Sequence, residues 1–228
     1  MTVAFAFLEG HAHAETGDAP DIHSWALPQE KQRKKLTVEY LKRHTPKHKL
    51  TGDITKDAYM TPRVIVLHWT GGDSLKATWN TFSGASLRGR KKLRKASSLN
   101  VGAHFLVDRD GSIYQLVDER RIMRHCIGLN HVAIGIENVG DGKRSALTKA
   151  QQKANEFLVR SLAKRFPITH LIGHYEYRRM ESHPYFSEAD PKYRTIKIDP
   201  GQEFLHAVRQ QVSDLSLLDA DSKKPRGH

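Results

Sequence analysis

The sequence of 228 residues contains a single cysteine, Cys126. An intramolecular disulfide is therefore impossible, and so is a zinc site built from paired cysteines. Any metal site in this chain must use histidine, aspartate or glutamate side chains. Histidine is abundant, with 14 residues, but most of these lie in polar stretches that are typical of surface positions. We expect only a few of them to converge on one site.

Long hydrophobic runs are also absent. No stretch approaches the ~18 apolar residues that a membrane-spanning helix needs, so we expect no transmembrane segment. The first twenty residues contain a short apolar run and an Ala12-His13-Ala14 triplet that resembles an export-signal cleavage site. They lack a basic region, and Glu9 interrupts the apolar run. Residues 1–26 are therefore predicted to be either a remnant export signal or a disordered tail.

Acidic residues are few in comparison with basic ones. The chain has 37 Lys and Arg against 25 Asp and Glu, which gives a formal net charge of +12. This charge predicts an anionic partner, such as nucleic acid, a membrane surface or an acidic polymer. No zinc-finger spacing, RNP-like aromatic motif or evident recognition helix accompanies it. We therefore expect no nucleic-acid partner. A basic nucleic-acid binder remains as an alternative, but only the net charge favours it.

Hydrophobic patterning divides the chain into four parts. After residues 1–26 comes an N-terminal helical extension over 27–62, with a helix over 28–44 that we expect to pack on the outside of the main domain. Residues 63–212 are long enough for one well-packed domain. Residues 213–228 are predicted to form a flexible C-terminal tail.

The main domain alternates between strand and helix patterns. Short apolar runs rich in β-branched residues predict buried strands, and two runs around a turn at 108–111 predict a hairpin. The clearest helix begins at the Thr148 capping box and ends before Pro167. This order indicates an α/β fold, a single domain with a central mixed β-sheet flanked by helices. The expected elements are, in order, VIVLHW, SLKATWNTF, GAHFLVDRDGSIYQLV, VAIGIENVG, residues 148–166, THLIGHYEY and GQEFLHAVRQQV.

Two histidines lie at the ends of predicted strands. His68 and His174 each follow an apolar run, so their side chains can meet at one sheet edge if the strands are neighbours. Asp199, in KIDPG, lies in a loop that could return to the same edge, although Asp before Pro-Gly is also typical of a helix start. Two imidazoles and one carboxylate suit a hydrolytic zinc centre with a position for water. By spacing alone, this His-His-Asp set is weak evidence.

Five motifs occur in one order, and together they resemble the zinc-dependent N-acetylmuramoyl-L-alanine amidases of the type 2 family, relatives of the peptidoglycan recognition proteins. The resemblance covers residues 63 to about 212. It implies the amidase and peptidoglycan recognition protein fold, with a Zn²⁺ ion held by His68, His174 and Asp199. The motifs are VIVLHWTGG, GAHFLVDRDGSIYQLV, VAIGIENVG, LIGHYEY and KIDPG.

The resemblance also implies two catalytic residues. Glu137, at the end of IGIE, matches the acidic catalytic residue, and Lys197 matches the lysine beside the last ligand. The implied reaction is hydrolysis of the amide between N-acetylmuramic acid and L-alanine in peptidoglycan or muropeptides. Glu137 would move a proton from water to the leaving amine, and Lys197 would stabilise the oxyanion.

The alternative is a protein of the same fold that binds peptidoglycan without cutting it. The complete set of ligands together with Glu137 argues for the enzyme, because a pure binder does not need an acid that activates water. The positive charge suits the carboxylates of stem peptides. The N-terminal residues favour a periplasmic or secreted protein, and the alternative is a cytoplasmic one acting on imported fragments.

Other features have no assigned chemistry. His104 and His125 are expected near the cleft, where either contact with substrate or a structural role is possible. The basic loop over 88–95 has no predicted role, and the long loop over 178–195 is interpreted as a lid on the substrate side. The sequence leaves the oligomeric state, the preferred stem peptide and the need for an anhydro sugar open.

Overall fold

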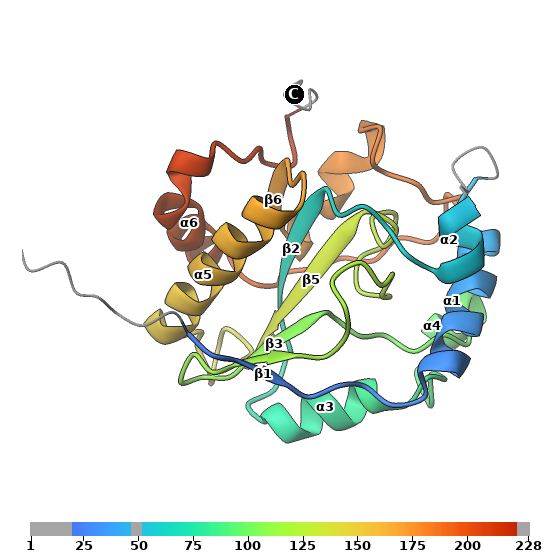
Figure 1. Cartoon of the computed structure of the whole chain (residues 1–228), viewed down its shortest axis with the longest axis horizontal. Coiled ribbons are helices and arrows are strands. Elements are labelled where there is room, and N and C mark those ends of the chain that lie inside the picture. The colour runs from blue at the N-terminus through green and yellow to red at the C-terminus, as the bar shows by residue number, and fades with distance from the viewer. Residues whose placement is uncertain (1–19, 47–51, 223–228) are drawn as a thin grey trace, which may run out of the picture.

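The computed structural model of the protein describes residues 20–46 and 52–222, and a six-stranded β-sheet lies at its centre (Figure 1). The sheet order is β1-β4-β3-β5-β2-β6. β3 and β4 are antiparallel, whereas every other neighbouring pair is parallel, so the prediction of a mixed sheet is confirmed. The strands are β1 (Ile22–Ser24), β2 (Val64–Trp69), β3 (Phe105–Val107), β4 (Ile113–Gln115), β5 (Ala133–Asn138) and β6 (His170–Gly173).

Helices flank this sheet. The α-helices are α1 (Glu30–His44), α2 (Gly52–Asp57), α3 (Leu75–Ser83), α4 (Lys91–Ala96), α5 (Lys149–Arg165) and α6 (Gln202–Gln211). Two 3₁₀ helices follow β6 and α6, at His174–Ser182 and Ser213–Leu215. In Figure 1, α5 and α6 lie together beside β6, while α1, α2 and α4 gather on the other side of the molecule. Within the described ranges, no helix combines the length and the apolar character of a membrane span.

The strongest helix prediction is confirmed in its local chemistry. Thr148 accepts a hydrogen bond from the Gln151 backbone N–H at 3.1 Å, and the Gln151 side chain accepts one from the Thr148 N–H at 2.9 Å. These two bonds satisfy donors that a helix start leaves unpaired. α5 then covers one face of the sheet with its apolar residues.

Side chains of β2 alternate between the two faces of the sheet, as in any strand. Ile65 and Leu67 belong to the main core, which also contains the apolar face of α5. Val64 and Val66 belong to a separate cluster on the opposite face. His68 continues this second series, so it lies on the face that α5 does not cover.

The N-terminal region contributes more to the fold than predicted. The disordered tail or signal remnant predicted over 1–26 is wrong for its last residues, because Ile22–Ser24 pair with β4 at the edge of the sheet; residues 1–19 lie outside the described ranges. The helix predicted over 28–44 exists as α1, but it does not pack only on the outside. Its Tyr40 is 3% exposed and belongs to the main core.

Two further segments are more ordered than predicted. Part of the basic loop over 88–95 is the short helix α4. The flexible tail predicted over 213–228 is wrong for residues 213–222, because Leu218 pairs with His170 at the end of β6 and Ala220 is buried. Residues 223–228 lie outside the described ranges.

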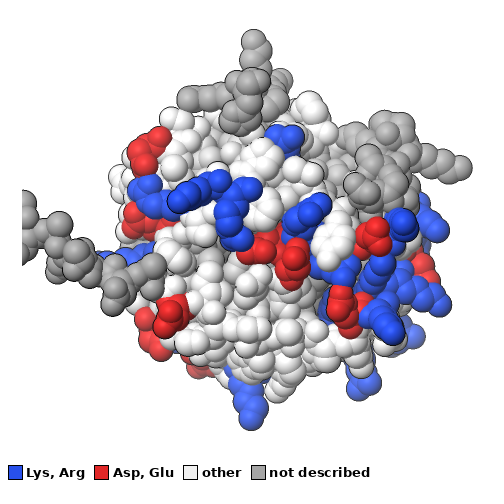
Figure 2. All heavy atoms as spheres, in the orientation of Figure 1, with Lys and Arg blue, Asp and Glu red and all other residues white. Residues whose placement is uncertain are grey.

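Basic side chains are unevenly distributed over the surface. Figure 2 shows Lys and Arg, with some Asp and Glu among them, gathered on the side where α1 and α4 lie. Exposed basic residues of this region are Lys31, Lys35, Lys42, Arg43, Arg88, Arg90, Lys91, Arg94 and Lys95. On the face shown, basic residues are therefore densest beside α1 and α4.

Candidate metal centre

The sheet brings the two predicted strand-end histidines together. β2 and β6 are parallel neighbours in which Leu67 pairs with Gly173. His68 directly follows Leu67, and His174 directly follows Gly173 as the first residue of the 3₁₀ helix after β6. The expectation that both strands end at a common edge is therefore confirmed.

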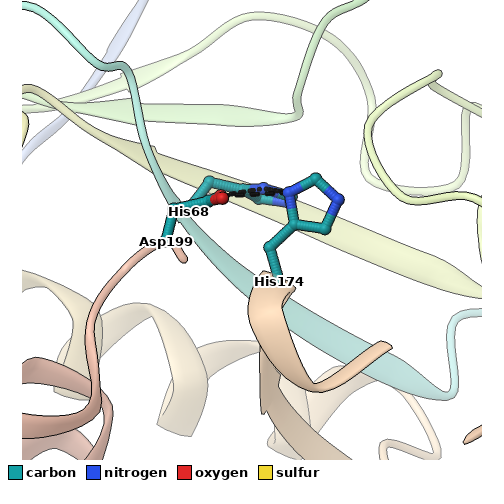
Figure 3. A group of neighbouring side chains, drawn as sticks. All are labelled: His68, His174 and Asp199. Atoms are coloured by element: carbon teal, nitrogen blue, oxygen red, sulfur yellow. Dashed lines mark hydrogen bonds and ion pairs between the residues drawn. The ribbon is translucent and has the colours of Figure 1, made fainter. Parts of the chain in front are cut away.

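The third predicted side chain joins them from the loop before α6. Nδ1 of His68 lies 2.9 Å from Nδ1 of His174, and Asp199 Oδ2 lies 3.2 Å from the former and 3.0 Å from the latter. Figure 3 shows the three side chains converging on one point. Tetrahedral ligands about 2.1 Å from zinc are separated from each other by about 3.4 Å. The spacing and the donor types therefore fit a zinc ion, and no other such group occurs in the described part of the chain.

The backbone conformation of KIDPG shows whether Asp199 caps the following helix or faces the two histidines. Gly201, with φ of +87°, is the residue before α6, and the structure has no side-chain cap there. Asp199 instead lies two residues earlier, where its carbonyl accepts a hydrogen bond from the Tyr175 N–H at 3.0 Å. Its carboxylate is thus free to face the histidines, so the metal-ligand geometry is present and the helix cap is not.

Side-chain alternation explains the residues around Asp199. Lys197 and Asp199 both line the same cavity. Ile196, which precedes Lys197, is 89% exposed, and Ile198, which lies between Lys197 and Asp199, is 61% exposed. Both side chains therefore face away from the cavity. An extended segment therefore delivers a cation and a carboxylate to one side.

Charge and burial oppose each other at these residues. Burial disfavours the carboxylate of Asp199, but the adjacent rings of His174 and His68 outweigh it and hold the pKa of this carboxyl well below its usual range. Burial, reinforced by the neighbouring His68, lowers the pKa of His174 to about 4. The site therefore favours a neutral imidazole at His174 and an ionised carboxylate at Asp199, which are the forms that bind a metal.

Glu137 lies next to the histidines without joining them. It pairs in register with His68 across β2 and β5, and it lines the cavity of about 250 Å³ above the cluster. Its Oε2 atom is buried and has no hydrogen-bond partner among the described residues. Burial, with the charge of Asp199, raises the pKa of Glu137 well above its ordinary value. Such a carboxylate is suited to take up a proton.

Sequence patterns gave no signal for several other residues of the cavity wall. Tyr40 comes from α1 and Arg90 from the turn before α4, and Tyr193 and Thr195 come from the loop over 178–195. Only the last of these segments was predicted to lie on the substrate side. Contacts between distant segments placed the others there.

The two histidines expected near the cleft have different environments. His125 lines the cavity and lies 3.1 Å from His68, measured from Nδ1 to Nε2. His104 is fully buried, with its Nε2 bonded to the Arg121 carbonyl at 2.7 Å and its Nδ1 accepting from the Gly135 N–H at 3.0 Å. His104 therefore has a structural role, whereas His125 belongs to the site.

Comparisons with known proteins identify the family of this chain and proteins of similar fold. The family model described as N-acetylmuramoyl-L-alanine amidase matches residues 58–202. An endolysin of Escherichia phage T7 is 35% identical over 83 residues, which cover 34% of this chain and about half (55%) of that relative. The fold is similar to that of a selenomethionine AmpD derivative, with a TM-score of 0.51 and 22% identity over 83% of this chain and 93% of the other. The endolysin amidase LysCS from Clostridium intestinale has a TM-score of 0.48 and 22% identity, over 68% and 85% of the two chains.

Proposed function

This chain belongs to the N-acetylmuramoyl-L-alanine amidase family, and from this premise we propose that it is a zinc-dependent hydrolase. Its substrate is the amide that joins the lactyl group of N-acetylmuramic acid to L-alanine, in peptidoglycan or its fragments. One observation supports the proposal above all others. A buried His-His-Asp cluster faces a cavity that is also lined by Lys197 and by Glu137, whose Oε2 atom has no hydrogen-bond partner in the part of the chain that the structure describes.

Three side chains would hold the metal: His68 and His174 through Nδ1, and Asp199 through Oδ2. A bound zinc ion supplies a Lewis acid that polarises the amide carbonyl and makes water acidic enough to attack near neutral pH. Three protein ligands are the usual number at catalytic zinc sites, where a fourth position serves water or substrate.

Glu137 handles the protons of the reaction. Its Oε2 atom is buried beside the cluster, so it can accept a proton from the attacking water. The raised pKa then allows the resulting carboxylic acid to keep this proton until the leaving amine of L-alanine takes it.

Lys197 stabilises the negative charge that develops on the carbonyl oxygen. It lines the same cavity as Glu137, and a fixed cation is most effective where water is largely excluded. Its position two residues before Asp199 couples the cation to the metal ligand through one short extended segment.

We also propose that the protein acts in the periplasm or outside the cell, where intact peptidoglycan lies. The excess positive charge supports this proposal, because stem peptides carry carboxylates and attract a basic surface. A cytoplasmic protein of the same activity would act on imported muropeptides instead.

Mass spectrometry of purified muropeptides tests the proposal. The protein is incubated with them as purified, after treatment with a chelator, and after zinc is restored, and Asp199→Ala serves as the matched protein lacking one ligand. We expect free stem peptides that begin at L-alanine, lost on chelation and regained with zinc. Intact muropeptides under all conditions, together with retention of the protein on insoluble peptidoglycan, would assign it instead to non-catalytic binding.

A further inference from the structure

The environment of His68 extends beyond the three ligand atoms. Its second ring nitrogen, Nε2, lies 3.1 Å from Nδ1 of His125. The other nitrogen of His125, Nε2, lies 3.0 Å from the backbone carbonyl oxygen of Ala133. A line of hydrogen bonds therefore runs from the ligand cluster through His125 to the start of β5.

The direction of these bonds follows from simple valence. A carbonyl oxygen can only accept, so Nε2 of His125 carries a hydrogen and donates it to Ala133. In a neutral imidazole the other nitrogen, Nδ1, then has a lone pair, and it accepts from Nε2 of His68. His68 thus carries its hydrogen on Nε2, which leaves the Nδ1 lone pair directed at His174 and Asp199.

We propose that His125 is a positioning residue that fixes the tautomer and ring orientation of His68, so that Nδ1 is presented to the metal. This inference rests on the proposed zinc site. Outer partners of this kind orient metal-binding histidines, and their loss typically weakens metal binding about 10–100-fold.

The structure holds His125 in place from two sides. The backbone N–H groups of His125 and Cys126 both donate to Asn130 Oδ1, at 2.9 and 2.8 Å. Asn130 in turn donates from Nδ2 to the Tyr40 hydroxyl at 3.0 Å. Tyr40 lies in α1, outside residues 58–202 that match the family model. The N-terminal helix therefore takes part in supporting the metal centre.

The space for the His125 ring depends on a glycine in β5. A Cβ atom built at Gly135 would lie 2.8 Å from Cγ and Nδ1 of His125. Contacts this short are not tolerated, so an alanine at this position would push the ring away from His68. The close approach of ring and strand is thus part of the same arrangement.

Two variants of His125 separate its hydrogen bond from its bulk. His125→Leu keeps much of the bulk of the side chain but has no atom that accepts a hydrogen bond from His68. His125→Asn keeps an acceptor, because its side-chain oxygen can occupy the position of Nδ1. His170→Leu is the control, because His170 is also fully buried but lies at the other end of the same strands. Four residues of strand place this end about 13 Å away.

The first measurement is zinc affinity by competition with a chromogenic chelator. We expect a loss of about 10–100-fold in His125→Leu, a clearly smaller loss in His125→Asn, and no change in His170→Leu. Equal affinity of the wild type and a folded His125→Leu protein would overturn the inference. A wild-type protein that binds no zinc would instead overturn the proposed function.

The second measurement does not need zinc. Long-range ¹H–¹⁵N NMR spectra of the metal-free protein report which nitrogen of each histidine carries hydrogen. We expect His68 with its hydrogen on Nε2 in the wild type and a mixture of tautomers in His125→Leu. A mixture in the wild type, or an unchanged His68 in the variant, would contradict the positioning role of His125.

Discussion

Two clusters of buried histidines lie at opposite ends of β2 and β6, and only one of them has the character of a metal site. At the carboxyl ends, the rings of His68 and His174 are 4.4 Å apart between centroids. At the amino end of β6, the rings of His170 and His183 are 4.8 Å apart. Burial and ring proximity are therefore nearly the same in the two places.

The partners of the rings make the difference. At the first end, Asp199 and both histidines direct ligand atoms at one point beside a cavity. At the second, Nδ1 of His170 lies 2.8 Å from the Thr169 hydroxyl, and Nδ1 of His183 accepts from the Tyr185 N–H at 3.1 Å. At this end, Nδ1 of each histidine is used for an internal hydrogen bond. In this protein, the carboxylate and the convergence of three ligand atoms therefore distinguish the candidate metal site from the second pair of buried imidazoles.

The largest effect is expected from removing the carboxylate that distinguishes the two ends. Asp199→Ala should weaken zinc binding more than ~100-fold, the upper range for loss of an outer partner, and abolish turnover. Asp219→Ala is the matched change near His170, whose electrostatic environment includes Asp219, and it should leave zinc binding unchanged. Measured zinc content after dialysis checks both, and full zinc in Asp199→Ala would remove it from the ligand set.

The next largest effect is expected from a change that removes proton transfer but keeps metal binding at the carboxyl ends of β2 and β6. Glu137→Gln keeps the size of the side chain but cannot accept a proton, so kcat should fall by about 10²–10⁴-fold. Zinc content should stay at the wild-type level, because Glu137 is outside the ligand group. Muropeptide cleavage and metal analysis of one preparation decide the outcome, and a near-normal rate would exclude Glu137 from proton transfer.

A smaller effect is expected from the cation of the site. Lys197→Met removes the charge but keeps the aliphatic length, and kcat should fall by roughly 10²-fold with a lesser rise in KM, because the charge acts on the transition state. Lys192→Met, an exposed lysine of the preceding loop, is the control and should behave like the wild type. A rise in KM with unchanged kcat would make Lys197 a substrate-binding residue instead.

The smallest effect concerns the second histidine cluster and the stability of the fold. Burial, reinforced by His183, lowers the pKa of His170 to about 4 in the folded protein, against about 6.5 in an unfolded chain. Between these values the unfolded chain binds more protons, so the contribution of His170 to the free energy of unfolding should fall as the pH falls from about 6.5 to 4 and change no further below it. Allowing for solvent screening, this contribution is roughly 1–2 kcal/mol.

Urea unfolding at several pH values checks this expectation. His170→Leu removes the titrating group, so its stability should fall less steeply than that of the wild type over the same pH range. Parallel curves for the two proteins would mean that His170 does not titrate differently in the folded and unfolded states.

Much of the fold followed from local sequence patterns. The apolar run ending at His68, the hairpin around 108–111 and the capping box at Thr148 each correspond to an element of the structure. Local patterns failed where long-range contacts decide the structure. Ile22–Ser24 has too few residues to show a strand period, and it is a strand only because β4 offers a partner. Residues 213–222 are placed by their contacts with β6.

The candidate site divides in the same way. His68, His174, Asp199, Glu137 and Lys197 were predicted from motifs, and the structure places all of them around one cavity. The roles of His125 and Tyr40 were not predicted. His125 was expected near the cleft with its role left open, and Tyr40 was expected in a helix on the outside of the domain. Their hydrogen bonds join segments that are far apart in the chain, which local patterns do not show.

The sequence by itself determined which residue types are available and where strands and helices can form. Its single cysteine excludes a metal site built from paired cysteines, and two of its histidines, His68 and His174, follow apolar runs at predicted strand ends. The tertiary structure alone decided that β2 and β6 are neighbours, that Asp199 turns toward them, and that His125 fixes the ring of His68. These features depend on the register of strands and on distances of a few ångströms, and only the folded chain sets such distances between residues separated by many others in sequence.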